Sequence, residues 1–238
     1  MNLSSALEEF GLLQRRKHRG EEGQRTAAAL AGLREFLVDF SGYGNTEDVR
    51  PGDLMIFLLD YYPAEEEPDT DVALALLDAA AGFALWLLER GERALAPFAA
   101  REDRLRQDLP RVLEALALMK DHARREDLDT SRTLADPEAG EDVGSIGAGL
   151  SRVARLDEID YAASEEEYYT LLKSTEGALE LESAEREALG EGPVGPVSVP
   201  ARASELLKPG DIIHAEIAPG PSGWELLEVF GIRPGGYA

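Results

Sequence analysis

The 238-residue sequence contains no cysteine. Disulfide bonds, thiolate catalysis and cysteine-ligated zinc or iron–sulfur clusters are therefore excluded, and a cytoplasmic location is expected. Histidine is also scarce, and the three residues show none of the HxH or HExxH spacings typical of histidine metal sites. The first twenty residues lack the charged start, apolar segment and small-residue cleavage site of a targeting peptide, so we expect no such peptide here.

The usual sequence signatures of catalysis and cofactor binding are missing as well. The glycines of GSIGAG, residues 144–149, do not follow the GxGxxG order, and neither a phosphate loop nor a GxSxG nucleophile elbow occurs. Acidic residues cluster at 65–67, 157–160 and 165–167, but without the spacing of an EF-hand calcium loop. We therefore expect no cofactor and no metal, and no motif identifies catalytic residues.

Basic residues are much fewer than acidic residues. Lysine and arginine number 24 against 47 aspartates and glutamates, which gives a net charge of -23 and a pI near 4.4. Such a field repels nucleic-acid phosphates, so direct nucleic-acid binding is disfavoured and a protein or basic peptide is the favoured partner. The one concentrated basic run, QRRKHRG, contains Arg15, Arg16, Lys17 and Arg19. We interpret it as a solvated helix end whose cations complement the helix dipole, with a surface for a phosphate-bearing partner as the alternative.

Long hydrophobic runs are limited to residues 72–88, where Asp78 is the only charge. This run is at the short limit for a membrane span, is rich in alanine and lacks a strong flanking pattern. It therefore predicts the central core helix of a helical domain, with no membrane association.

The first half of the sequence has the periodicity of packed helices. A short helix is predicted from Ser4 or Ser5 to Arg16, and a second begins at Glu21. The second helix presents one apolar stripe, because its large residues recur at spacings of three and four: Leu30, Leu33, Leu37 and Phe40.

Two further helices lie on either side of the hydrophobic run. Pro51 and Asp53 are placed to begin the first of them, and Pro63 is expected to end it. Its predicted buried face is Leu54, Phe57, Leu58 and Tyr61. The last amphipathic segment starts at Leu109 and continues through Leu113, Leu116, Met119 and Ala123.

Beyond residue 150 the period changes toward two, which is typical of strands. Residues 168–172 and 178–182 flank the turn STEG and predict a hairpin, and residues 194–199 predict another short strand. Residues 152–159 are predicted as a strand or a helix. The fold class is α+β: a helical bundle over 1–128, a linker over 129–149, and a small β-rich domain over 150–238 that is a barrel or a sheet covered on both sides.

The C-terminal segment KPGDIIHAEIAPGPSGWELLEVF contains the candidate site residues of the second half. Its KPGD start predicts a type II turn, and the strand after it alternates two partly apolar faces. His214 and Glu216 share one face, where the carboxylate is placed to orient the imidazole, although an ordinary strand histidine is the favoured interpretation. Trp224 is interpreted as an anchor of the small core, with stacking on a ligand as the alternative.

Residues 26–91 carry a family resemblance. The segments REFLVDFSGYG, DVRPGDLMIFL and GFALWLLERG resemble the helical core-binding domain of tyrosine recombinases. The likeness covers about a quarter of the chain and implies a compact helical bundle. It implies no activity and no site residue, because no arginine, histidine and tyrosine catalytic series follows these segments.

Three hypotheses for function follow from the acidic field and the missing motifs. The first is a non-catalytic binding or regulatory protein that acts through protein–protein contacts. The second is a carboxylate-based enzyme, with or without a divalent metal, whose site lies between the two domains. The third is a nucleic-acid-associated regulator, or an acidic mimic of DNA that binds a basic partner.

Overall fold

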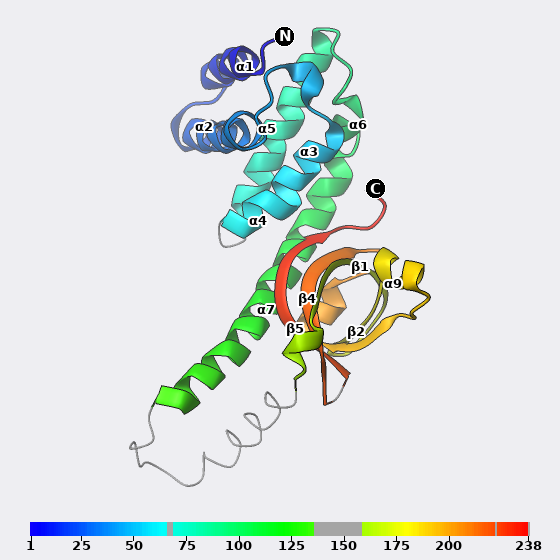
Figure 1. Ribbon diagram of the computed structural model, residues 1–238. Helices are drawn as coiled ribbons and strands as arrows, with labels where there is room; N and C mark the ends of the chain where they lie inside the picture. Colours follow the sequence, from blue (N-terminus) through cyan, green and yellow to red (C-terminus); the bar gives the residue numbers. More distant parts are fainter. Residues whose placement is uncertain (66–68, 136–158, 222, 238) are drawn as a thin grey trace. The chain divides into compact units, whose positions relative to one another are not determined.

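The computed structural model describes residues 1–65, 69–135, 159–221 and 223–237. It confirms the α+β architecture, with an N-terminal helical region followed by a closed five-stranded barrel (Figure 1). The chain divides into two compact units, Met1–Leu113 and Glu114–Ala238, and the division falls inside helix α7 (Glu102–Ala135). The first part of the expected linker, residues 129–135, therefore belongs to a helix, and its remainder lies outside the described residues.

The first unit is built from helices joined by short connections. Its α-helices are α1 (Leu3–Lys17), α2 (Gly20–Arg34), α3 (Pro51–Ile56), α4 (Tyr62–Glu65), α5 (Thr70–Glu89), α6 (Ala96–Ala99) and the first turns of α7. Two π-helical turns, η1 (Glu35–Phe40) and η3 (Phe57–Tyr61), extend α2 and α3, and a 3-10 turn, η2 (Thr46–Asp48), precedes α3.

Side-chain caps explain where two of these helices begin. Asp69 is the N-cap of α5 and accepts a hydrogen bond from the backbone N–H of Asp71 at 2.8 Å. Pro51 occupies the first turn of α3, and the carboxylate of Asp53 accepts from the backbone N–H of Arg50 at 2.7 Å. The start of α3 at Pro51 and Asp53 was predicted from the sequence.

Helix α5 forms much of the core of the first unit, as predicted. It is long and apolar enough to span a membrane by length and composition, but 56% of its most hydrophobic window is buried inside the protein. Phe83 is fully buried, and its ring lies 5.7 Å from that of Phe10 and 5.9 Å from that of Trp86, centroid to centroid. Packing of this kind is that of a central core helix.

The π-helical turns correct two predictions. Phe40 was assigned to the apolar stripe of α2, but it is 68% exposed, and Phe36 is buried instead. A π-helical turn adds a residue to the helical repeat, so the face that points inward changes within η1. Pro63 was expected to end a helix, but α3, η3 and α4 follow one another without a break, so the helical run continues across Pro63 to Glu65.

Helix α7 begins earlier than the sequence indicated. It starts at Glu102, and Pro110 lies inside it. The buried residues that precede the proline, Leu105 and Leu109, continue the stripe that was predicted only from residue 109 onward. Packing of the apolar face keeps α7 intact across Pro110.

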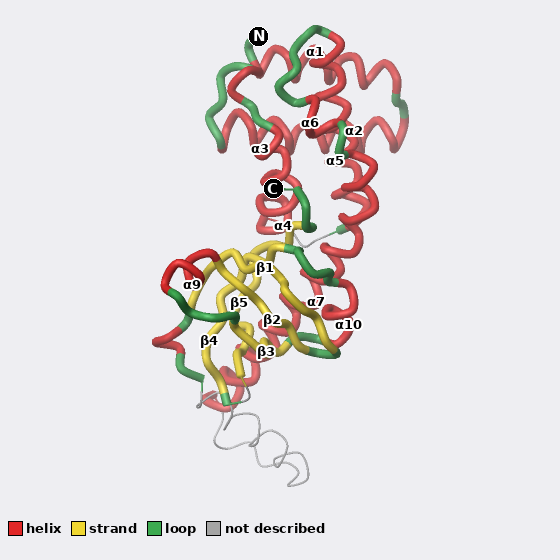
Figure 2. Tube along the Cα trace, turned by 90° about the vertical axis from the view of Figure 1, so that its right-hand side faces the viewer, coloured by secondary structure: helices red, strands yellow, loops and turns green. Residues whose placement is uncertain are grey.

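The second unit contains the barrel. Its described elements after α7 are a 3-10 turn η4 (Tyr161–Ala163), β1 (Glu165–Thr175), β2 (Ala178–Ser183), α9 (Ala184–Leu189), β3 (Val194–Ser198), α10 (Ala201–Leu206), β4 (Ile212–Gly220) and β5 (Gly223–Arg233). The strands close in the order β1-β2-β3-β5-β4 (Figure 2). The predicted β1–β2 hairpin, the short strand β3 and the strand β4 after the KPGD turn are all confirmed, and β4 pairs with β5 in a second hairpin. The predicted element at 152–159 lies almost entirely outside the described residues.

The topology of the barrel is that of an OB-fold. All neighbouring strands are antiparallel except β3 and β5, which are parallel, and the helix α10 connects β3 to β4. This order defines a five-stranded Greek-key barrel of the OB type. It specifies a scaffold rather than an activity.

The interior of the barrel follows the predicted alternation along β4. Ile213, Ala215 and Ile217 are fully buried, whereas Ile212, His214 and Glu216 face outward. In β5 the alternation is interrupted, because the pairing with β4 shifts at two β-bulges. The remaining interior residues of the strands are Tyr169, Leu171, Leu179, Leu181, Val194, Val197, Leu226, Val229 and Ile232.

The KPGD turn before β4 forms as predicted. Gly210 has a φ of 91°, which only glycine adopts readily, and the N–H of Asp211 donates to the carbonyl of Lys208 at 2.9 Å. The Asp211 carboxylate is buried. It accepts from the backbone N–H of Lys208 at 2.8 Å and from that of Gly235 at 3.0 Å, and so connects the turn to the end of the chain.

Candidate functional site

Two rows of side chains cross the outside of strands β1, β4 and β5. The first row is acidic: Glu166 on β1 lies opposite Glu216 on β4, which lies opposite Glu228 on β5. The second row is aromatic and contains Tyr168, His214 and Phe230. We call these six residues the barrel face. The two rows are neighbours, because on β1 and β4 their residues are separated by two positions along the strand.

The aromatic row is stacked. The Tyr168 and His214 rings are nearly parallel, at 14°, with centroids 4.2 Å apart, and the Phe230 ring lies 4.7 Å from His214. Phe230 takes this position because it is the extra residue of a β-bulge: His214 pairs with Gly231 and Ala215 with Val229. The bulge places the Phe230 ring on the outside of the barrel, beside His214.

His214 finds its carboxylate on the neighbouring strand. Its Nε2 lies 3.2 Å from the Oε1 of Glu166 on β1. Glu216 shares the face with His214, as predicted, but no described contact joins the two side chains. Strand pairing brings together residues 48 positions apart, which the sequence around His214 does not reveal.

A cation already lies over part of the barrel face. The guanidinium carbon of Arg233 is 4.9 Å from the centre of the Tyr168 ring, and its Nη2 is 3.5 Å from the Tyr168 hydroxyl. A guanidinium over an aromatic ring is attracted by the negative face of the ring. Arg233 therefore shows, within the same chain, how a guanidinium binds to the aromatic row of the barrel face.

Trp224 lies apart from the barrel face and outside the buried core. It is half-buried at the start of β5, opposite Val197 of β3. The Arg186 guanidinium lies 5.4 Å from its ring and also pairs with Glu165 at 2.7 Å and Glu191 at 2.9 Å. Its ring is thus partly covered by a cation of the same chain, and the predicted role as a core anchor is wrong.

The inner side of β1 holds the barrel face in place. Tyr169 is fully buried, and its hydroxyl donates to the backbone carbonyl of Glu165 at 3.2 Å. Burial raises the pKa of Tyr169 well above its ordinary value, and the carboxylates of Glu165 and Glu167 raise it further. The phenol therefore stays neutral and keeps the β1 backbone in register with Tyr168 facing outward.

The acidic row carries a cost in stability. Like charges directly opposite each other on neighbouring strands repel. We expect Glu216→Gln to raise the free energy of unfolding of the barrel by about 0.2–1 kcal/mol, because the central charge of the row is removed. Urea unfolding followed by Trp224 fluorescence, with Trp86→Phe in both proteins, measures the change. A decrease in stability would contradict the repulsive row.

The basic run of the sequence lies at the end of α1, as predicted. Arg15, Arg16 and Lys17 form the last turn of the helix, and Arg19 follows after the C-cap residue His18. The His18 Nδ1 lies 2.8 Å from the Oε1 of Glu22 on α2. Cations at this end of a helix interact favourably with its dipole.

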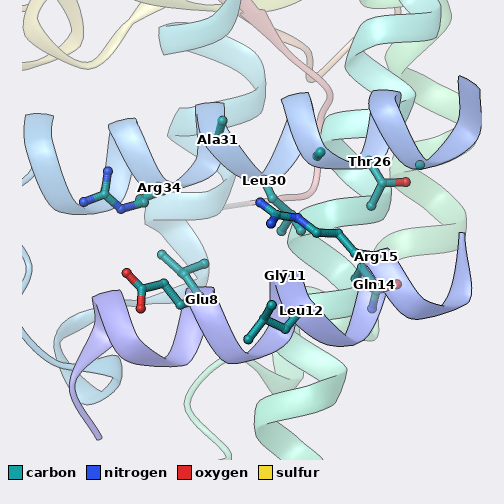
Figure 3. Close-up of a pocket in the computed structure, with 12 residues that line it drawn as sticks. Glu8, Gly11, Leu12, Gln14, Arg15, Thr26, Leu30, Ala31 and Arg34 are labelled. Atoms are coloured by element: carbon teal, nitrogen blue, oxygen red, sulfur yellow. The ribbon is translucent and has the colours of Figure 1, made fainter. Parts of the chain in front are cut away.

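A groove of about 390 Å³ runs between α1 and α2 (Figure 3). Its walls are mainly apolar, with Leu7 and Leu12 on α1 and Leu30 on α2. Glu8 and Arg34 lie at one end of it, and the Arg15 side chain reaches from the C-terminal part of α1 toward Leu30. We call it the α1–α2 groove. Of the predicted basic residues, only Arg15 lines it.

Comparisons with known proteins identify no relative: no family model, no curated protein and no solved structure matches. Among the described residues, no group of three or more histidine, aspartate or glutamate side chains is arranged to hold a metal ion. The geometry and charge of the barrel face are therefore the observations that bear on function.

Proposed function

We propose that the protein is a non-catalytic binding protein whose barrel face holds arginine or lysine side chains of a basic protein segment. The observation that carries the proposal is the acidic row Glu166, Glu216 and Glu228 beside the stacked aromatic row. The carboxylates accept hydrogen bonds from the cation, and the exposed aromatic rings contact its face or its aliphatic stem.

The energies of these contacts suit reversible binding. A hydrogen bond to a charged group contributes about 1.5–3 kcal/mol, and a cation–π contact at an exposed site about 0.5–1 kcal/mol. Two such side chains of a partner therefore contribute about 4–8 kcal/mol, which corresponds to reversible association in the millimolar to micromolar range. The overall charge of -23 also attracts a basic partner at long range and raises its rate of association.

The OB topology by itself does not favour a nucleic acid as the ligand. OB-folds bind oligonucleotides across strands 2 and 3. Here the outward residues of β2 include Glu180 and Glu182, and Trp224 beside β3 has Arg186 over its ring. Carboxylates at these positions repel phosphates, so a basic protein is the better ligand for this barrel.

The test is the binding of a labelled ten-residue peptide with five arginines, measured by fluorescence anisotropy against the full chain. We expect micromolar affinity that falls as salt is added, and a loss of about tenfold in Glu216→Gln, since one charged contact is removed. Tyr168→Ala is expected to weaken binding by a smaller factor, because it removes an aromatic contact.

Glu176→Gln is the matched control. Glu176 is exposed in the turn between β1 and β2, away from the barrel face. Its substitution by glutamine removes the same charge as Glu216→Gln, so this variant reports general electrostatic attraction alone. We expect less than a twofold change in this variant. Equal losses in Glu216→Gln and Glu176→Gln would disprove a specific site on the barrel face.

A further inference from the structure

The α1–α2 groove differs from the barrel face in chemistry and lies in the other unit. Leu12, on the wall of the groove, is 56% exposed, and Leu30 is only partly buried. Gly11 and Ala27 also line it, and a Cβ added at Gly11 would lie 3.9 Å from the side chain of Leu30. Apolar surface that faces water in this way is stabilised when a partner covers it.

The length of the groove matches two turns of a helix. Its α1 wall runs from Leu7 to Arg15, which is about 12 Å at a rise of 1.5 Å per residue. Residues i, i+3, i+4 and i+7 of a partner helix present their side chains over that same length. A groove between two adjacent helices also receives the ridge of a third helix in the usual manner of helix packing.

The positive charge of Arg15 indicates which kind of helix fits the groove. Figure 3 shows the Arg15 side chain reaching from α1 toward Leu30 of α2. No carboxylate pairs with Arg15 among the residues that the structure describes. An unpaired guanidinium beside an apolar groove complements a carboxylate on an otherwise apolar ligand surface.

We propose that the α1–α2 groove binds an amphipathic helix of a partner protein. The partner helix places apolar residues at i, i+3, i+4 and i+7 in the groove and a glutamate or aspartate against Arg15. This site is independent of the barrel face, so the protein has two binding surfaces of opposite preference: a basic segment on the barrel and an acidic amphipathic helix on the helical unit.

The probe is a labelled 14-residue peptide with leucines at i, i+3, i+4 and i+7 and two glutamates at the end of its apolar stripe. Its control is a peptide of the same composition with the order of residues scrambled. We expect saturable binding of the amphipathic peptide to the full chain by fluorescence anisotropy, and binding of the scrambled peptide that is at least about tenfold weaker, because the apolar stripe is lost.

Two pairs of variants locate the site. Arg15→Glu is expected to weaken binding at least about tenfold, while Arg16→Glu, with the same change of charge one residue away but outside the groove, changes it less than about twofold. Ala31→Trp is expected to fill the groove and abolish binding. Ala28→Trp places the same ring at another exposed alanine of α2 that does not line the groove, and is expected to leave binding intact.

Equal effects within either pair, or equal binding of the scrambled peptide, would overturn the proposal. A fluorescent fatty acid is tested in parallel. If it binds to the groove and the amphipathic peptide does not, the site takes a small amphiphilic carboxylate instead of a helix. Glu216→Gln is expected to leave binding of the amphipathic peptide unchanged, because Glu216 lies on the barrel face. The test of the α1–α2 groove is therefore independent of the test of the barrel face.

Discussion

Phe83→Ala is expected to lower the free energy of unfolding of the helical unit by about 3–5 kcal/mol. Phe83 is 0% exposed on α5, and its ring contacts those of Phe10 and Trp86. Removal of the ring takes away its burial and leaves a cavity that the surrounding helices fill only in part. A loss of this size is a large fraction of the stability of a domain.

Trp86 reports the unfolding directly, because it lies beside the deleted ring. Urea unfolding is followed by its fluorescence, with Trp224→Phe in every protein so that Trp86 is the only tryptophan. Leu85→Ala is the matched control, since Leu85 lies on the same helix but is 44% exposed, and a change within about 0.5 kcal/mol is expected.

If Phe83→Ala does not fold, Phe83→Leu provides the measurement. It retains most of the apolar volume and is expected to cost less than Phe83→Ala but more than Leu85→Ala. Equal stabilities of the position 83 and position 85 variants would contradict the assignment of α5 as a core helix.

Asp211→Ala is expected to destabilise the barrel by about 2–4 kcal/mol. The Asp211 carboxylate is 1% exposed and accepts from the backbone N–H groups of Lys208 and Gly235. Alanine leaves both N–H groups without this acceptor, and each unsatisfied group costs about 1–3 kcal/mol when it is buried from water.

Amide hydrogen exchange measures the loss where it occurs. Peptides from β1 and β4 are expected to exchange faster in Asp211→Ala, while peptides from α5 keep their rates, because the two units have separate cores. Asp211→Asn retains one acceptor oxygen and is expected to fall between the wild type and the alanine variant. Unchanged exchange in β4 would show that the turn does not depend on the carboxylate.

Several features of the fold were predictable because their causes are local. The start of α3 at Pro51, the KPGD turn and the β1–β2 hairpin depend on caps, on turn residues and on periodicity within a few positions. The burial of Ile213, Ala215 and Ile217 follows from the same period of two. The error at Phe40 arose because the helical repeat itself changes within the π-helical turn η1.

The candidate site was predictable only in part. The sequence pointed to His214 and Glu216 and to Arg15, and each of these lies in one of the two proposed binding surfaces. Glu166, Tyr168 and Phe230 were missed as partners of His214, although the outward position of Tyr168 next to the inward Tyr169 follows from strand alternation. These side chains lie next to His214 only because β1 and β5 both pair with β4 in a particular register.

The sequence by itself determined the α+β class, the acidic field, the core helix and the faces of β4, because composition and short-range periodicity contain that information. Only the tertiary structure decided which carboxylates form a row, which rings stack and where α1 and α2 leave a groove. These arrangements join residues up to about sixty positions apart through strand register and helix packing, and neither is specified by the pattern within any one segment.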